Sequence, residues 1–450
     1  MKKNWILFSI IFLVVIILIS RGLLKDDSYD PDKLFTVKQL QQDFLKLRKI
    51  LENNHPTLYY FHAKETLDRY FDNVYDSIDS SMSVNDFYVL LSRVSARANC
   101  GHTYFSLPKG YWKNANKIYN YFPFKLYFQD GKAYILRNYT KNTTIPLGAE
   151  ILSINDTPIS QIITNFLETI SSDGLNQVYK YAKMNRLDYG LFPGNSEFPD
   201  TYHISYIDRR DSLKKDIIIQ ALTHREIADA QKQQLPENWS YLPFDFKMID
   251  SLHTAILTVK DFIGYSNKDF QSFLFNAFES IHQNGIQNLI IDVRNNDGGD
   301  PQNANAILSY LTNTSYIYFP PHVLGYWSLK KPIEPNPLNF KGNIYVLIDG
   351  GCFSTTGHFL SMIKYHKWGT LIGEESGGSY ICNGCVGNYK LPNTKIILNC
   401  ARCIYRANVH GFSREKGIMP DIDVKPRIED LINDRDTVME IALEIVRYQT

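Results

Sequence analysis

The segment at 349–358 places a hydroxyl side chain where it could act as a nucleophile. Residues 344–348 are apolar and predict a buried strand, two glycines follow, and Ser354 stands at the start of the next predicted helix. A hydroxyl at a helix N-terminus faces free N–H groups, which can receive the charge of an oxyanion when the hydroxyl attacks a carbonyl. A simpler interpretation is that Ser354 only caps the helix. The segment does not contain the Gly-x-Ser-x-Gly pattern of α/β-hydrolases.

A polar, glycine-rich loop forms a second candidate. Residues 289–293 predict a strand buried on both faces, and residues 295–299 (Asn-Asn-Asp-Gly-Gly) follow it. Glycines let backbone N–H groups approach a ligand closely. Because this loop and the Ser354 segment each follow an apolar strand, we expect both loops at the same edge of one sheet.

Alternating strands and helices surround these two loops. A strand at 255–259, a helix at 269–282 and the two buried strands predict an α/β core over residues 240–450. Upstream, residues 35–115 predict a helical region that begins with a capping box at Thr36 and Gln39 and carries Gly101-His102-Thr103 in a turn.

Residues 117–222 are rich in predicted strands. They include a hairpin whose turn is Asp130-Gly131. Residues 146–155 begin with a proline and a glycine and continue as an apolar strand, a pattern that resembles part of a PDZ domain. We therefore expect an inserted PDZ-like, β-rich domain here.

The first 25 residues predict a membrane anchor. Lys2 and Lys3 precede an apolar run at 5–20, which Arg21 closes and residues 22–24 extend toward bilayer length. No small-residue cleavage site follows. We expect an uncleaved signal-anchor with the bulk of the chain extracytoplasmic; a cleaved signal peptide is the alternative.

The overall charge argues against a nucleic-acid partner. Forty-eight Lys and Arg against 47 Asp and Glu leave a net charge of +1, which provides no basic surplus for a phosphate backbone. A hydrophobic content of 44% excludes a disordered chain.

Four of the six cysteines form a regular pattern. Cys382, Cys385, Cys400 and Cys403 spell C-x2-C-x14-C-x2-C, close to a zinc-ribbon spacing. Export would favour disulfides instead, and a strand leading into Cys400 would place Cys400 and Cys403 on opposite faces. Structural zinc, one or two disulfides and free thiols therefore remain open, and none of them is catalytic.

Taken together, the segments resemble the tail-specific (C-terminal-processing) serine protease superfamily. The matching residues are 289–299, 345–356, 371–374 and 417–422, in family order, and the upstream regions extend the likeness over nearly all of the chain that follows the anchor. The resemblance implies a ClpP/crotonase-like β-β-α core, Ser354 as nucleophile, peptide or unfolded-protein substrates, and no metal or cofactor.

The resemblance also bears on the base. One branch of the superfamily uses a lysine downstream of the serine, but Ser379 occupies that position here. The other branch, similar to the tricorn core protease, takes its base from a Gly-His-Thr segment, which makes His102 the expected base. Imidazole can accept the serine proton at neutral pH. His358, one helical turn after Ser354, is the rival base.

The remaining site residues follow from the same resemblance. Glu415 is the expected residue that orients the imidazole, although it lies one position out of the usual register, and Gly101 replaces a serine of the tricorn-like tetrad. The backbone N–H groups of Thr355 and of Gly299 or Gly298 are the expected oxyanion hole. The sequence thus predicts a membrane-anchored serine endopeptidase; the alternative is a non-catalytic lipid- or peptide-binding protein on the same fold.

Overall fold

A computed structural model describes residues 29–142, 144–187, 198–234, 241–263 and 267–449. The predicted anchor at 1–25 lies outside the described residues. No described helix combines the length and hydrophobicity that crossing a bilayer would need.

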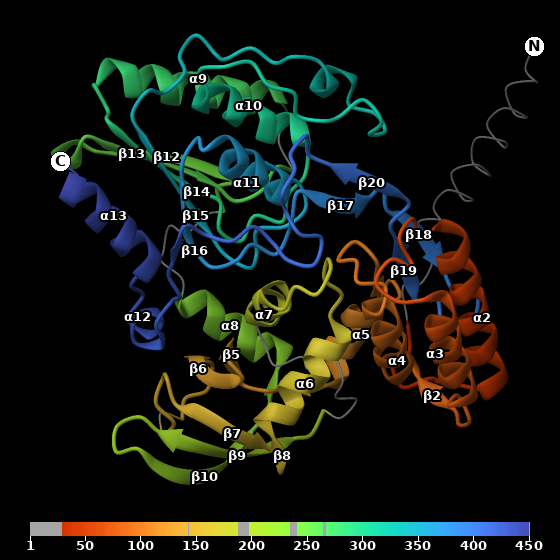
Figure 1. Cartoon of the computed structure of the whole chain (residues 1–450). Coiled ribbons are helices and arrows are strands. Elements are labelled where there is room, and N and C mark those ends of the chain that lie inside the picture. The colour runs from red at the N-terminus through yellow and green to blue at the C-terminus, as the bar shows by residue number, and fades with distance from the viewer. Residues whose placement is uncertain (1–28, 143, 188–197, 235–240, 264–266, 450) are drawn as a thin grey trace, which may run out of the picture.

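The core contains one six-stranded sheet in the order β12-β13-β14-β15-β16-β21 (Figure 1). β12 runs antiparallel to β13, and every other neighbouring pair is parallel. All of β14 and nearly all of β15 are buried, as their continuous apolar sequences predict. The strands are β12 (Phe244–Ile249), β13 (Thr254–Val259), β14 (Asn288–Asp292), β15 (Asn343–Ile348), β16 (Thr370–Gly373) and β21 (Ile422–Asp423).

Helices cover both faces of this sheet, which confirms the predicted α/β class. α9, α10 and α11 contribute to the large hydrophobic cluster on one face, and α13 packs with Tyr345, Leu347 and Ile372 on the other. The helices are α9 (Asn267–Gln283), α10 (Pro301–Leu311), α11 (Thr355–His366), α12 (Ile428–Ile432) and α13 (Thr437–Gln449), with short 3-10 turns at Asp250–Leu252 and Trp327–Lys330.

The helical region packs around a hydrophobic core that it shares with residues 391–401. Thr36 and Gln39 form the predicted capping box at the start of α2. β3 pairs with β19 of the core, and Asp43, fully buried, accepts hydrogen bonds from Thr394 at 2.6 and 2.8 Å. The elements are β1 (Leu34–Phe35), α2 (Val37–Asn54), α3 (Lys64–Asp76), β2 (Met82–Ser83), α4 (Val84–Ala96), β3 (Tyr104–Ser106) and α5 (Tyr111–Ile118). These contacts tie the turn after α4 to the core.

Two pairs of core strands lie between the core sheet and the helical region. β18 pairs with β19, and β17 pairs with β20. The four strands are β17 (Ile381–Gly384), β18 (Gly387–Lys390), β19 (Ile397–Cys400) and β20 (Cys403–Arg406).

The strand-rich region, residues 117–234, forms an antiparallel sheet in the order β10-β9-β7-β6-β5, with β8 beside β7. The last residue of α7, Asn185, bonds the backbone of the edge strand β5. Its side chain accepts the N–H of Phe128 at 2.7 Å and donates to the C=O of the same residue at 3.0 Å. The elements are β4 (Asn120–Tyr121), β5 (Phe124–Gln129), β6 (Lys132–Asn138), β7 (Glu150–Ile154), β8 (Thr157–Pro158), α6 (Ile159–Thr169), α7 (Val178–Asn185), β9 (Thr201–Asp208), β10 (Leu213–Gln220), β11 (Leu222–Thr223) and α8 (His224–Gln234).

Candidate active site

Ser354 occupies a strained turn between β15 and α11. Its backbone has φ 55° and ψ −121°, a region that a residue with a Cβ rarely adopts. Its side chain makes no capping bond to the helix, so the capping interpretation does not hold. The hydroxyl instead lies 3.0 Å from Nε2 of His102, a residue 252 positions earlier in the chain.

His102 is held by aromatic stacking. Its ring lies 4.7 Å from the Phe353 ring at an interplanar angle of 29°, and Phe353 in turn stacks on Tyr179 of α7 at 4.3 Å. A Cβ on Gly101 would lie 2.5 Å from the Phe353 ring, so only glycine fits before the histidine without a shift of that ring. Phe353 therefore links the nucleophile turn to the loop that carries the imidazole.

The environment of His102 keeps the imidazole neutral. Burial, together with the smaller effect of the positive charge of Lys183, lowers the pKa of His102 to about 4, and Asp297 opposes the shift. Nδ1 of His102 is buried and has no hydrogen-bond partner among the described residues. At neutral pH the imidazole therefore holds a single proton. In the tautomer with that proton on Nδ1, Nε2 is unprotonated and can accept the proton of Ser354.

The structure does not bring Glu415 to this ring. Glu415 is exposed, and its backbone N–H and C=O bond Ser413 and Leu175. The carboxylate that bonds the histidine loop is Asp173, whose Oδ1 accepts the N–H of Gly101 at 2.8 Å. Burial raises the pKa of Asp173 to about 7. Sequence reasoning missed Asp173, whose only local signal was a polar turn that ends in a glycine.

Two backbone N–H groups point to an oxyanion hole. No hydrogen bond to a described residue engages the N–H of Thr355 or of Gly299, whereas the N–H of Gly298 donates to Oδ1 of Asn296 at 2.8 Å. The hydroxyl of Thr355 donates to the carbonyl of Gly299 at 2.6 Å, which holds the two loops together. Of the two predicted glycines, Gly299 is the one with a free donor.

Asn296 is a second residue that sequence reasoning did not single out. It is fully buried, its carbonyl accepts the N–H of Phe353 at 2.9 Å, and its Oδ1 also accepts the hydroxyl of Thr356 at 2.8 Å. Its side-chain N–H donates to Val259 at 3.0 Å. Asn296 therefore fixes the glycine loop against the nucleophile turn.

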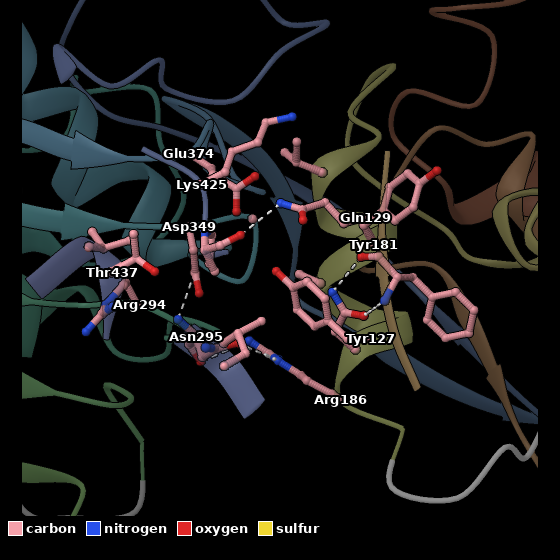
Figure 2. Close-up of a pocket in the computed structure, with 18 of the residues that line it drawn as sticks. Tyr127, Gln129, Tyr181, Arg186, Arg294, Asn295, Asp349, Glu374, Lys425 and Thr437 are labelled. Atoms are coloured by element: carbon pink, nitrogen blue, oxygen red, sulfur yellow. Dashed lines mark hydrogen bonds between the residues drawn. The ribbon is translucent and has the colours of Figure 1, made fainter. Parts of the chain in front are cut away.

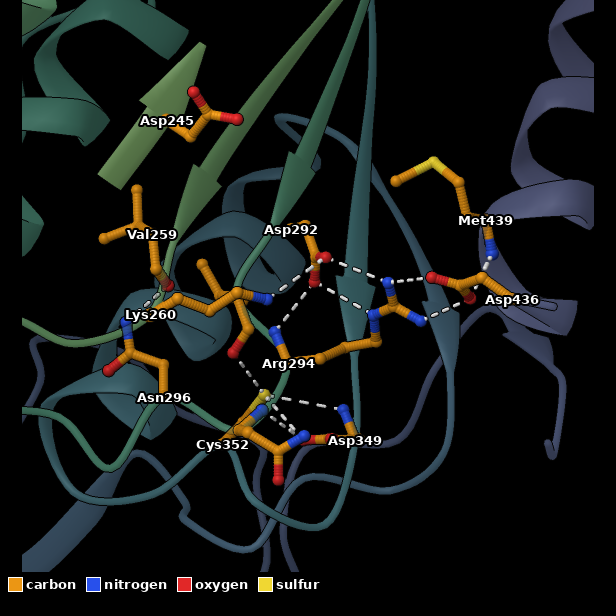
Figure 3. A network of polar contacts seen from close by, with 12 residues as sticks. Asp245, Val259, Lys260, Asp292, Arg294, Asn296, Asp349, Cys352, Asp436 and Met439 are labelled. Atoms are coloured by element: carbon orange, nitrogen blue, oxygen red, sulfur yellow. Dashed lines mark hydrogen bonds and ion pairs between the residues drawn. The ribbon is translucent and has the colours of Figure 1, made fainter. Parts of the chain in front are cut away.

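A network of hydrogen bonds and ion pairs joins the same two loops to each other and to the core sheet (Figure 3). The carboxylate of Asp349 accepts the N–H groups of Asn295 and Gly351, at 2.8 and 2.9 Å. The thiol of Cys352 donates to Val293 at 3.0 Å. Arg294 bonds Asp292 and Asp436, which joins the glycine loop to the start of α13. Both loops are thereby fixed to the ends of their strands.

The rival groups have other partners. Nε2 of His358 lies 3.5 Å from the thiol of Cys382, its ring packs against Tyr318 and Phe319, and burial lowers its pKa to about 3. Ser379, at the position of the lysine in the other branch, donates to the carbonyl of Ser413.

The cysteines are free thiols, and the four of the C-x2-C-x14-C-x2-C pattern do not gather at one point, although Cys385 and Cys403 adjoin each other. Cys382 lies beside His358, Cys400 belongs to the core of the helical region, and the thiol of Cys385 lies 2.9 Å from the Tyr405 hydroxyl. Among the described residues, no three metal-ligating side chains gather into one group. Of the three alternatives left open by the sequence, the structure shows free thiols, and the described residues do not form the zinc-ribbon arrangement.

Ser354 and His102 open into a cleft of about 560 Å³. Its walls combine the helical region, α7 and the glycine loop, and they carry Tyr104, Ile263 and an ion pair between Lys183 and Asp297 at 3.3 Å. A cleft of this size with a few convergent polar groups has the dimensions of a ligand-binding site.

Comparison with known proteins agrees with this geometry. The model of peptidase family S41 matches residues 253–424. A crystal structure of mature CPAF is 14% identical with a TM-score of 0.65, covering 91% of this chain and 96% of CPAF. A structure of mature CPAF complexed with lactacystin is 15% identical with a TM-score of 0.66, covering 92% of this chain and 98% of CPAF. A search of curated proteins finds no match.

The solved structures establish the shared fold, and the family match covers the strands and loops that carry Ser354, Gly299 and Thr355. The predicted resemblance and the predicted enzyme class are thereby confirmed. Residues 253–424 therefore belong to peptidase family S41, a family of serine-type peptidases.

Proposed function

We propose that the chain is a serine endopeptidase that hydrolyses peptide bonds through an acyl-enzyme, with Ser354 as nucleophile and His102 as general base. The observation that carries this proposal is the 3.0 Å separation between the Ser354 hydroxyl and Nε2 of His102. A hydroxyl that donates to a neutral imidazole can lose its proton as it attacks a carbonyl.

The reaction then follows from the positions of the groups. Oγ of Ser354 bonds the carbonyl carbon while His102 takes the proton, and the N–H groups of Thr355 and Gly299 bind the oxyanion. The C–N bond breaks as the imidazolium returns its proton to the leaving amine. Water, deprotonated by the same imidazole, releases the acyl group. The strained backbone of Ser354 supports this role, because a binding protein has no need for a strained serine beside a buried histidine.

Asp173 and Phe353 take the supporting role that the family resemblance assigns to Glu415. Asp173 fixes the backbone just before His102, and the Phe353 ring fixes the plane of the imidazole. The Phe353 face can also stabilise the imidazolium that forms during the reaction. We therefore treat both as positioning residues rather than catalytic residues.

The substrate class and the location belong to the same proposal. Peptides or unfolded proteins suit the open cleft, and the apolar run between Lys3 and Arg21 would anchor the chain with its peptidase part outside the cytoplasm. Protease accessibility of intact cells, compared with lysed cells, tests the orientation.

The catalytic test compares the purified full chain with Ser354→Ala. We expect wild type to cleave an unfolded protein and to be labelled by a fluorophosphonate, and the variant to do neither. Ser272→Ala, which removes an exposed hydroxyl from α9, is the matched control and should behave as wild type. Equal cleavage and labelling in Ser354→Ala would exclude the serine mechanism.

A further inference from the structure

A second cavity, of about 660 Å³, lies between the strand-rich region and the core (Figure 2). It shares no lining residue with the active-site cleft. α7 contributes to both spaces: Tyr179 and Lys183 line the cleft, whereas Val178, Ala182 and Arg186 line the cavity. The helix therefore separates two distinct sites.

The walls of this cavity come from two sheets. One wall is a face of β5, from which Lys125, Tyr127 and Gln129 project at alternate positions. The other wall is the carboxyl edge of the core sheet, where Asp349 follows β15 and Glu374 follows β16. Open α/β sheets bind ligands in crevices at this edge.

Most charged groups around the cavity already have partners. Arg294 pairs with Asp292 and Asp436, and Lys425 pairs with Asp130 at 2.8 Å. Arg186 pairs with Asp297 of the glycine loop at 2.5 Å. Asp349 accepts the N–H groups of Asn295 and Gly351. Arg435 pairs with Glu440, and Lys260 pairs with Asp292.

Two lining groups differ from these. Among the described residues, the carboxylate of Glu374 has no hydrogen bond and no ion-pair partner, and the hydroxyl of Tyr127 has no hydrogen bond. Figure 2 shows the two side chains approaching the same space from opposite walls, with the Tyr181 ring nearby. The pKa of Glu374 is raised to about 7, chiefly by burial; the positive charge of Lys425 opposes the rise, and the smaller influence of Asp349 adds to it.

A cation would satisfy both groups at once. A partly buried carboxylate such as that of Glu374 gains more from an opposite charge than an exposed one does, because water screens the pair less. A phenol oxygen can accept a further hydrogen bond from the same cation, and aromatic faces favour cations.

We propose that this cavity binds an alkylammonium or guanidinium group, with Glu374 as its counter-ion and the Tyr127 hydroxyl as its second contact. The group could be carried by a basic side chain of a peptide or by a free amine, since both present the same chemistry. The site also lies beside Asp349, whose carboxylate holds the backbone of Asn295 and Gly351, so that an occupant would stand next to the loop that leads to Ser354. The proposal concerns binding and does not depend on the serine mechanism.

The test is calorimetric titration of the full chain at pH 7. One probe is agmatine, which carries an ammonium and a guanidinium, and the other is N-acetyl-Gly-Lys-Gly-amide, a neutral-ended peptide with one ammonium. We expect at least one probe to bind and protons to be released on binding, because Glu374 must ionise. Titration in two buffers of different ionisation enthalpy measures that release.

Three variants locate the site. We expect Glu374→Gln to lower the affinity about tenfold or more and Tyr127→Phe to lower it a few-fold. Glu279→Gln, which removes an exposed carboxylate from α9, is the matched control and should leave binding unchanged. If Glu374→Gln does not fold, Tyr127→Phe alone decides. Absence of binding to wild type by both probes, or unchanged affinity in the folded Glu374 and Tyr127 variants, would overturn the proposal. The probe that binds more tightly identifies the source of the cation.

Discussion

The active-site cleft and the second cavity, on either side of α7, differ in whether their polar side chains have bonding partners. In the active-site cleft, Ser354 bonds His102 and Lys183 pairs with Asp297. In the cavity behind α7, Glu374 and the Tyr127 hydroxyl have no partner among the described residues. The cleft is organised in advance to act on a neutral peptide bond, whereas the cavity leaves a negative group to be neutralised by an occupant.

The two candidate bases, His102 and His358, give the largest expected effect. We expect His102→Ala to lower kcat by about four orders of magnitude, because the base is lost. His358→Ala should retain far more activity but unfold at a lower temperature, because it leaves a cavity among Tyr318, Phe319 and Cys382. Kinetics and thermal unfolding on both variants distinguish the roles, and the reverse pattern would assign the base to His358.

The glycine before His102 gives the next effect. Gly101→Ala places a Cβ 2.5 Å from the Phe353 ring and should disturb the stack, so we expect kcat to fall about 100-fold. Adding Phe353→Leu makes room for the new methyl group and should recover part of the loss. A double variant no better than the single one would show that the contact with Phe353 is not the cause.

Asp173 should act on kcat and not on substrate binding. We expect Asp173→Ala to lower kcat about tenfold with little change in KM, because the Gly101 N–H loses its acceptor and the histidine loop loosens. Asp173→Asn keeps an acceptor oxygen and should retain most of the activity. Glu415→Gln, at an exposed position, is the control, and a larger loss in that variant would return the orienting role to Glu415.

The pH profile gives the smallest effect. Activity needs neutral His102, so kcat/KM should fall as the pH drops through about 4 rather than 6.5. Lys183→Gln removes a charge that lowers the pKa of His102 and should move this acidic limb to higher pH, whereas Asp297→Asn should move it to lower pH. Profiles of the two variants that shift in the same direction would contradict this electrostatic account.

Much of the fold could be predicted because its signals are local. The apolar runs of β14 and β15 and the capping box at Thr36 and Gln39 all appear in the structure. The glycine loop and the nucleophile turn meet at one edge of the sheet, as parallel strands require. The side chains that join these loops could not be predicted, since Asn296 and Phe353 look like ordinary polar and apolar residues in the chain.

The orienting residue shows the limit most clearly. Family resemblance directs attention to Glu415, yet the carboxylate that bonds the histidine loop comes from Asp173. The sequence likewise gives no local sign that Glu374 lacks an ion-pair partner among the described residues. That property depends on which carboxylates the nearby cations bond, as Lys425 bonds Asp130.

The sequence by itself determined the order of strands and helices and the residue types of the site, because hydrophobic periodicity, caps and turns act over a few neighbouring residues. Only the tertiary structure decided that His102 rather than His358 meets Ser354. It also decided that, among the residues the structure describes, Gly299 rather than Gly298 has a free N–H and Glu374 has no ion-pair partner. The physical reason is that hydrogen bonds and ion pairs depend on distances of a few ångströms between segments that lie far apart along the chain.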